Sequence, residues 1–234
     1  EDMGDITEHL HHLGHATSAA DAERVLAGLG FQHSDMTRLT ESYWPLQDDI
    51  PLLDTSCGDV LRAAAAAHRD RTALVEGNAD AASRRRWSYG ALLHDAERTA
   101  RSLLNVFKPG DHVAVWAANS PAWMIVPYGL ALAGMVLVTV NPAYRASELA
   151  YVLRQSRARG VFHARDYRGL DMRAAVDEAV TGEGLNLAVI ACLDDLADFV
   201  AAHDQGVVLP AVDPRQPCMI QYTSGTTGQP KGAL

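Results

Sequence analysis

The chain has 234 residues, of which 48% are hydrophobic and 21% are charged, and its formal charge is −9 at pH 7. This length and composition suit one large globular domain, or two small ones, with a sizeable core. An acidic chain gains nothing from nucleic-acid phosphates or anionic lipid, so nucleic-acid and membrane-surface partners are disfavoured.

Residues 1–50 are predicted to form an irregular or partly helical lead-in. His11 and His15 would share one face of a helix, where two imidazoles could bind a metal. No carboxylate or cysteine completes a convincing ligand set, so we favour a solvated helix and predict no metal site. Glu1 opens the chain without the segments of a secretory signal, and the last residues stop within a motif. Both ends are therefore expected to be cuts in a longer protein.

Regular structure is predicted from Asp54 onwards. Ser56 and Asp59 have the spacing of a capping box, and Ser88 is a second candidate helix cap. Helices are predicted at 56–67, 88–103, 122–134, around 149–153 with Gly160 as the stop, 172–180 and 193–202. Strands are predicted at 72–75, 113–116, 136–140, 161–162, 187–191 and 219–222, with a linker at 206–217.

The alternation of strands with helices predicts the fold class. It is typical of βαβ units, and we therefore expect an α/β fold with a mainly parallel sheet flanked by helices. Residues 122–140 carry no charge, but Pro127, Gly129 and Gly134 interrupt them. We interpret this run as a buried helix followed by a buried strand, so no transmembrane segment is predicted.

The three cysteines are Cys57, Cys192 and Cys218, which lie far apart in the sequence. An odd number without a Cys-x-x-Cys pair predicts neither a disulfide framework nor a zinc site. We interpret all three as buried small hydrophobic residues in a cytoplasmic protein that is kept in a reducing compartment.

The segment from Ile220 to Gly232 is rich in chemistry. A short apolar strand leads into a loop of hydroxyls and glycines that ends in a lysine. Glycines let several backbone N–H groups point at one anion, hydroxyls add donors, and Lys231 adds a positive charge. These properties suit a polyphosphate. The loop lacks the Gly-Lys-Ser/Thr of a Walker A motif, and a flexible linker would not explain the leading strand or the Pro-Lys-Gly ending.

The run from Tyr222 to Gly232 resembles the phosphate-loop signature of the AMP-forming acyl-CoA synthetases, within the adenylate-forming superfamily. The resemblance extends from about residue 54 to the end. It also rests on Val113–Trp116, Ala131–Gly134, Val140–Tyr144, and Glu148-Leu149 with Leu153 and Ser156. It implies the N-terminal portion of that family's large domain. By position in the motif, it implies that ATP is held by Thr223, Ser224, Gly225, Thr226, Thr227, Gly228 and Lys231.

The resemblance further implies a two-step reaction of a carboxylic acid, expected to be a fatty or similarly apolar acid. ATP with Mg²⁺ converts the acid into acyl-AMP, and the thiol of coenzyme A then displaces AMP. The family's magnesium-binding glutamate, ribose-binding aspartate, acyl tunnel and catalytic lysine belong to later regions. Residues 51–234 are therefore expected to be an incomplete AMP-binding domain without the C-terminal domain. We assign no catalytic residue and expect the isolated chain to be inactive.

Two other interpretations share the same loop. The first is an adenylating enzyme that passes its acyl group to an acceptor other than coenzyme A. The second is a truncated product that binds nucleotide without catalysis.

Overall fold

The structure, a computed structural model, describes residues 53–223 and 230–234. His11 and His15, the two candidate metal ligands, lie outside the described residues. So does most of the predicted phosphate loop, residues 224–229. The helices are α3 (Cys57–His68), α4 (Tyr89–Leu104), α5 (Pro121–Leu132), α6 (Ala146–Gln155), α7 (Met172–Glu183) and α8 (Leu196–His203), with 3-10 turns η2 (Ala81–Ser83) and η3 (Leu193–Asp195).

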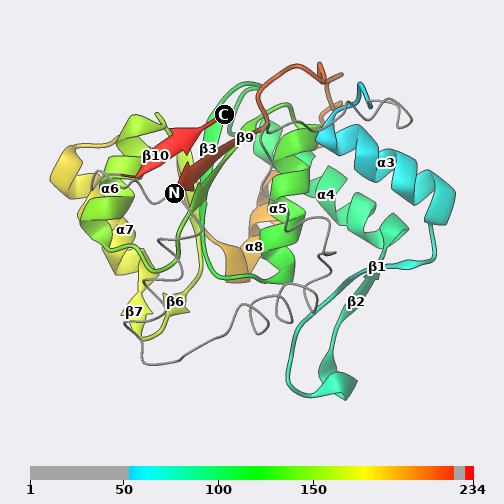
Figure 1. Ribbon diagram of the computed structural model, residues 1–234, viewed down its shortest axis with the longest axis horizontal. Helices are drawn as coiled ribbons and strands as arrows, with labels where there is room; N and C mark the ends of the chain where they lie inside the picture. The colour runs from blue at the N-terminus through cyan, green and yellow to red at the C-terminus, as the bar shows by residue number, and fades with distance from the viewer. Residues whose placement is uncertain (1–52, 224–229) are drawn as a thin grey trace, which may run out of the picture. The chain divides into compact units, whose positions relative to one another are not determined.

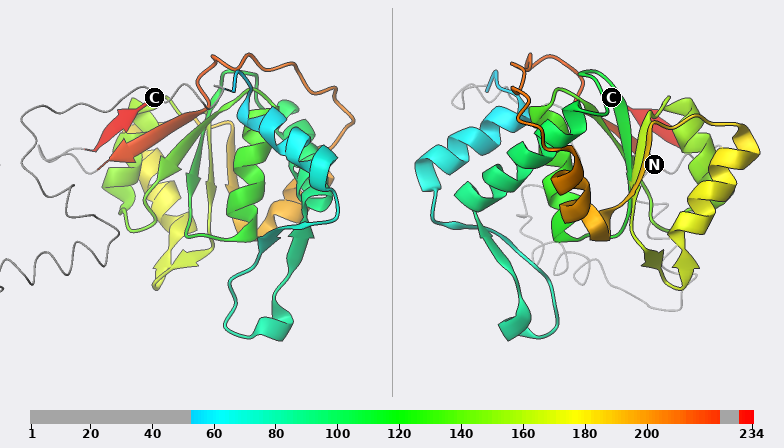
Figure 2. Two further views of the ribbon diagram at one scale, coloured as in Figure 1. Left: turned by 45° about the vertical axis from the view of Figure 1, so that its right-hand side comes forward. Right: turned by 180° about the vertical axis from the view of Figure 1, so that it is seen from behind.

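The strands form one main sheet and two small ribbons. They are β1 (Thr72–Val75), β2 (Arg86–Ser88), β3 (His112–Trp116), β4 (Val136–Val140), β5 (Gly160–His163), β6 (Asp166–Tyr167), β7 (Leu170–Asp171), β8 (Val189–Cys192), β9 (Met219–Thr223) and β10 (Lys231–Ala233). β1 pairs with β2 and β6 with β7, each antiparallel. The β1–β2 ribbon extends from the end of α3 and the start of α4, away from the main sheet (Figures 1 and 2).

The main sheet has the order β10-β9-β4-β3-β5-β8. All neighbours pair in parallel except β10, which runs antiparallel to β9 at one edge. This architecture is the α/β class that the alternating pattern predicts. Because the strands of β9, β4, β3, β5 and β8 run in the same direction, their carboxyl ends lie at one edge of the sheet.

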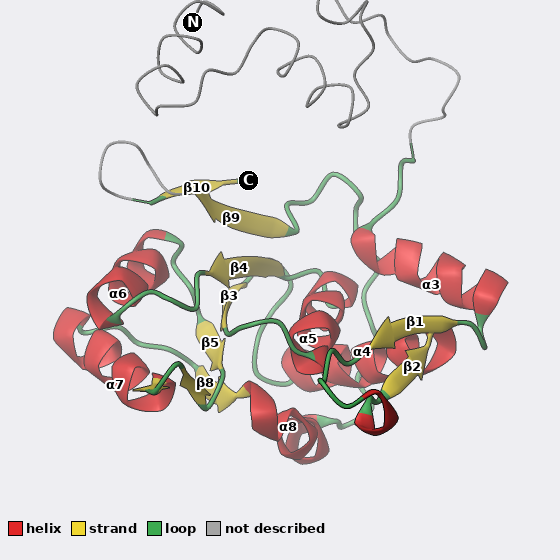
Figure 3. Ribbon diagram, turned by 60° about the horizontal axis from the view of Figure 1, so that its bottom comes forward, coloured by secondary structure: helices red, strands yellow, loops and turns green. Residues whose placement is uncertain are grey.

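Helices cover both faces of this sheet. α6 and α7 lie on one face, and α5 and α8 lie on the other (Figure 3). The connection from β3 to β4 moves along the sheet in one direction, and those from β4 to β5 and from β5 to β8 move in the other. Since parallel crossovers are right-handed, opposite directions place their helices on opposite faces.

The apolar sequence of the central strand β3 is explained by its burial on both faces. Val113 and Val115 join the core beneath α4, α5 and α8, whereas Ala114 and Trp116 join the core beneath α6 and α7. All four side chains are fully buried. Successive residues of a strand point to opposite faces, so a strand covered on both faces needs an unbroken apolar run.

Helix caps follow the sequence signals closely. The hydroxyl of Ser56 accepts a hydrogen bond from the backbone N–H of Asp59, and that of Ser88 accepts one from Ala91. The uncharged run is, as predicted, a helix followed by the strand β4. Within the described part of the chain, no helix combines the length and the apolar character that crossing a membrane requires.

Gly160 does not end a helix, as the sequence analysis predicted, but begins β5. α6 ends at Gln155, and Arg157 beyond it takes a positive φ of 54°. A Cβ at Gly160 would lie 2.5 Å from Cζ of Phe107. A glycine is therefore required here because the Phe107 ring lies so close to the strand. The rules for where helices end do not reveal such a contact.

The prediction that the cysteines are buried is wrong. Cys57 and Cys218 are exposed, and Cys192 is partly exposed. Cys57 and Cys218, 161 residues apart in sequence, bring their Sγ atoms to 3.8 Å from one another. Sequence spacing gave no sign of this contact, because it depends on how the start of α3 packs against the segment that leads into β9.

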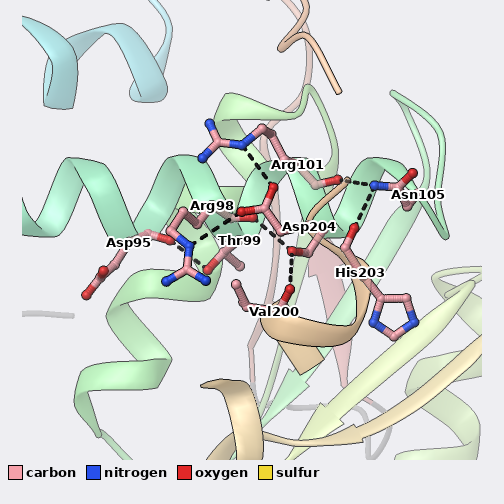
Figure 4. Close-up of polar contacts among 9 residues, drawn as sticks. Asp95, Arg98, Thr99, Arg101, Asn105, Val200, His203 and Asp204 are labelled. Atoms are coloured by element: carbon pink, nitrogen blue, oxygen red, sulfur yellow. Dashed lines mark hydrogen bonds and ion pairs between the residues drawn. The ribbon is translucent and has the colours of Figure 1, made fainter. Parts of the chain in front are cut away.

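Polar contacts fasten the end of α8 to α4 (Figure 4). Asp204 accepts hydrogen bonds from Nε of Arg101 at 3.1 Å and from Nε of Arg98 at 3.4 Å. The Asn105 amide donates to the carbonyl oxygen of His203 at 2.7 Å. α8 ends at His203, and the following segment leads to β9 at the other side of the sheet. These bonds therefore fix the position at which that segment leaves α8.

Candidate functional site

The two ends of the predicted phosphate loop lie opposite one another in a hairpin. β9 and β10 pair antiparallel, and the register places Lys231 against Thr223. The Thr223 hydroxyl lies 3.5 Å from the carbonyl oxygen of Lys231, and both residues are exposed. The remaining predicted loop residues, Ser224, Gly225, Thr226, Thr227 and Gly228, lie outside the described residues. The structure thus brings the first and last predicted phosphate contacts together at the mouth of the loop.

The hairpin's first arm is a strand of the main sheet. β9 pairs in parallel with β4, and the N–H of Leu137 donates to the carbonyl oxygen of Cys218 at 3.0 Å. Ile220 is buried among the core residues beneath α6 and α7. A buried side chain and ladder hydrogen bonds hold β9 in register, so Thr223 is delivered to the carboxyl edge of the sheet at a fixed position.

Helix α6 contacts both arms of the hairpin (Figure 1). The Tyr151 hydroxyl donates to the carbonyl oxygen of Pro230 at 3.2 Å, just before the second arm. On the first arm, the Tyr222 hydroxyl donates to Oε1 of Gln155 at 2.5 Å. Tyr151 and Gln155 lie one turn apart on the same side of α6. One helix therefore positions the base of the loop on both sides.

Two tyrosines near this base, Tyr222 and Tyr144, have raised pKa values. Burial, followed by the neighbouring Tyr151, raises the pKa of Tyr222. Burial and then the charge of Glu148 raise the pKa of Tyr144, which lies on the loop after β4. A phenol of ordinary pKa, about 10, is already protonated at neutral pH, so the Tyr222 hydroxyl can donate to the Gln155 oxygen, and the raised pKa only extends this to higher pH.

Tyr151 and Gln155 are site residues that the sequence analysis missed. The amphipathic pattern of this helix draws attention to Leu149, Val152 and Leu153, which are buried. The spacing of four between Tyr151 and Gln155 is visible in the sequence, but such a pair is ordinary on a helix surface. Only its contact with a hairpin formed by residues near 222 and 230 gives it a role.

A separate cleft lies on the other face of the sheet, between α4, α5 and α8. Its volume is about 360 Å³. Its polar side chains are largely engaged with one another, since Arg85 pairs with Glu76 at 2.8 Å and Nε1 of Trp87 donates to Asp95 at 3.0 Å. Residues 53–223 and 230–234 hold no group of three or more His, Cys, Asp or Glu side chains that could bind a metal ion.

The chain is similar in sequence to known proteins. Residues 61–234 match the family described as AMP-binding enzyme. A mouse protein, "Medium-chain acyl-CoA ligase ACSF2, mitochondrial", is 33% identical over 219 residues, which cover 82% of this chain and 35% of that protein. The chain therefore spans about a third of the length of that curated relative.

Solved structures show the same fold. The anthranilate CoA ligase AuaEII, in complex with anthranoyl-AMP, superposes with a TM-score of 0.65 at 21% identity, over 79% of this chain and 34% of that one. The N-terminal domain of FACL13 from Mycobacterium tuberculosis gives a TM-score of 0.61 at 24% identity, over 76% and 43%. These likenesses confirm the predicted fold class, an α/β fold with a mostly parallel sheet between helices.

Proposed function

The chain belongs to the AMP-binding enzyme family, and we propose on this premise that the complete protein is an ATP-dependent carboxylate–CoA ligase. In the first step, a carboxylate oxygen attacks the α-phosphorus of ATP, the bond to the bridging oxygen breaks, and pyrophosphate leaves. In the second, the thiol of coenzyme A attacks the acyl carbon and AMP leaves. The products are an acyl thioester, AMP and pyrophosphate.

The observation that carries this proposal is the hairpin mouth, where Thr223 and Lys231 face one another across a loop of hydroxyls and glycines. Carboxylate and triphosphate repel, so the first step needs charge neutralisation and alignment more than a protein nucleophile. We propose that the β- and γ-phosphates are held by Thr223, Ser224, Gly225, Thr226, Thr227, Gly228 and Lys231. The cation of Lys231 and the loop's N–H groups would then stabilise the departing pyrophosphate.

Magnesium belongs to this proposal as the counterion of the triphosphate. The described residues hold no cluster of three potential ligands, so we assign no protein residue to the ion. Phosphate oxygens are strong ligands for Mg²⁺, and the ion commonly binds to a nucleotide site together with the nucleotide's phosphates. The chain's own contribution is to orient the phosphates.

The substrate class and the location are narrower proposals. The mouse relative is by name a medium-chain acyl-CoA ligase, which supports an apolar acid as substrate here. That relative is also by name mitochondrial, so cytoplasmic location rests on the cysteine content alone. We keep residues 1–50 as a separate lead-in and residues 51–234 as part of the AMP-binding domain. In the complete protein, cell fractionation tests the cytoplasmic location, and limited proteolysis tests the division into a lead-in and an AMP-binding domain.

Pyrophosphate release provides the test of function. The complete protein is incubated with ATP, Mg²⁺ and acids of increasing chain length, with and without coenzyme A. Acid-dependent pyrophosphate release, together with consumption of coenzyme A, is expected. Release without such consumption would favour another acyl acceptor, and no release with any acid would refute the ligase proposal. The 234-residue chain alone is expected to show no turnover, because the family's later catalytic regions are not among its residues.

A further inference from the structure

Two cysteines from opposite ends of the described chain meet at the surface. Cys57 is the first residue of α3, directly after its N-cap Ser56, and Cys218 immediately precedes β9. Their Sγ atoms are 3.8 Å apart, and both residues are exposed. The third cysteine, Cys192, follows a different pattern, since its thiol lies 3.6 Å from a carboxylate oxygen of Asp194.

The backbone on the α3 side of this pair is firmly held. The Ser56 hydroxyl accepts from the N–H of Asp59 at 3.1 Å, which fixes the first turn of α3. A Cβ added at Gly58 would lie 2.9 Å from Cδ2 of Leu132, so the first turn of α3 packs closely on the end of α5. Cys57 is therefore fixed relative to α5.

The backbone on the β9 side is held to the same region. The carbonyl oxygen of Cys218 accepts from the N–H of Leu137 on β4 at 3.0 Å. The Gln216 amide donates to the carbonyl oxygen of Gly134 at 2.5 Å, just after α5. Both cysteines are thus anchored to the junction between α5 and β4, and their separation is set by the packing of the domain.

We propose that Cys57 and Cys218 are a reversible disulfide site, which a peroxide oxidises to join α3 to the strand that enters the phosphate loop. A disulfide requires the sulfurs to approach to about 2.05 Å, so they must close a gap of roughly 2 Å. Both residues are exposed, so their side chains have room to rotate into that geometry. The proposal is independent of the ligase activity.

The chemistry balances with one peroxide molecule. One thiolate attacks a peroxide oxygen, the O–O bond breaks, and the departing hydroxide takes up a proton to form water. The resulting sulfenic acid is attacked at sulfur by the other thiolate, the S–O bond breaks, and a second water leaves. The two sulfurs lose two electrons in total, and the peroxide oxygens gain them. A dithiol such as dithiothreitol reverses the reaction by exchange.

The bond would join two residues that are 161 positions apart in the sequence. Such a cross-link restricts the unfolded chain, so the oxidised protein is expected to melt about 10 °C higher than the reduced protein. It would also tie the start of α3 to β9, which limits how far that strand can separate from the sheet.

The test uses the full chain and peptide mapping. The protein is treated with hydrogen peroxide, its free thiols are alkylated, and the monomer is digested without reductant and analysed by mass spectrometry. A peptide pair joined through Cys57 and Cys218, lost on treatment with dithiothreitol, is expected. The pair should persist in Cys192→Ser and be absent from Cys57→Ser and Cys218→Ser.

Two results would overturn the proposal. One is wild-type protein in which Cys57 and Cys218 both remain open to alkylation after peroxide treatment. The other is a cross-link that involves Cys192 or joins two chains in place of the intramolecular pair. Because mapping of the wild-type chain decides by itself, failure of a serine variant to fold leaves the test intact. The melting temperatures of oxidised and reduced wild-type protein give a second readout.

Discussion

The hydroxyl of Tyr151, on helix α6, donates a hydrogen bond to the carbonyl oxygen of Pro230 across a distance of 3.2 Å. This bond joins the middle of the chain to the far end of the predicted phosphate loop, just before Lys231. Among the described residues, the Tyr151 hydroxyl contacts the backbone at Pro230, and we assign it no contact with the phosphates. We therefore regard it as a positioning residue, which acts by fixing where the second arm of the hairpin begins.

Replacement of Tyr151 by phenylalanine tests this role in the complete enzyme. The variant loses one hydrogen bond, worth about 1 kcal/mol, and keeps the ring. We expect the KM for ATP to rise about 3- to 10-fold, while kcat stays within about twofold, because the misplaced loop weakens phosphate binding. Tyr128→Phe, on α5 at the other face of the sheet, is the matched control. Equal effects of both variants, or an unchanged KM for ATP in Tyr151→Phe, would contradict the positioning role.

Lys231 is expected to supply charge to the phosphates. In Lys231→Met the charge-assisted bonds are lost, at a cost of about 1.5–3 kcal/mol, so ATP should bind about 10- to 100-fold more weakly. Lys108, in the exposed turn before β3, is the only other lysine of the chain and provides the control Lys108→Met. Titration calorimetry with MgATP on the complete protein measures both. Wild-type affinity in Lys231→Met would remove the main support for the proposed site.

Gly160→Ala is expected to destabilise the fold. The added Cβ would lie 2.5 Å from Cζ of Phe107 and 3.1 Å from the carbonyl oxygen of Val189, on the next strand of the sheet. Overpacking of this kind costs about 1–3 kcal/mol. At Gly182, in α7, an added Cβ would meet nothing within 4 Å, so Gly182→Ala should stabilise the chain by about 0.5–1 kcal/mol. Urea unfolding compares the two, and a Gly160→Ala variant as stable as wild type would show that Phe107 moves aside freely.

Asp204 gives a prediction for pH dependence. Burial works against its ionisation, but the hydrogen bonds from Arg101 and Arg98 outweigh burial, and the pKa of Asp204 is lowered. A lowered pKa stabilises the fold above the unfolded-state value of about 3.9, and this stabilisation is lost as the pH falls through the folded-state pKa.

The variant Asp204→Asn tests this assignment. We expect it to lose about 1 kcal/mol of unfolding free energy at pH 7, and the gap from wild type should shrink below about pH 4. Glu178→Gln, an exposed change on α7, is the control and should show no comparable loss. A gap that is constant from pH 7 to pH 3 would mean that the charge of Asp204 plays no part.

Local features of the chain were predictable because their causes are local. Ser56 and Ser88 cap helices through hydroxyls that reach only three residues along the chain. The unbroken apolar run of Val113 to Trp116 indicates a strand covered on both faces, and it is β3, at the centre of the sheet. The strand that leads into the loop was also predicted from its own residues, and it is β9 (Met219–Thr223), in which Ile220 is buried.

The sequence by itself therefore determined the order of helices and strands, the α/β class and the loop that marks the family. The tertiary structure alone decided which distant residues meet: Tyr151 with Pro230, and Cys57 with Cys218. It also decided that a glycine must stand at residue 160, beneath the Phe107 ring. Periodicity and capping are properties of neighbouring residues. Contacts between residues far apart in the sequence depend instead on the order of strands in the sheet and on the faces that the crossover helices cover.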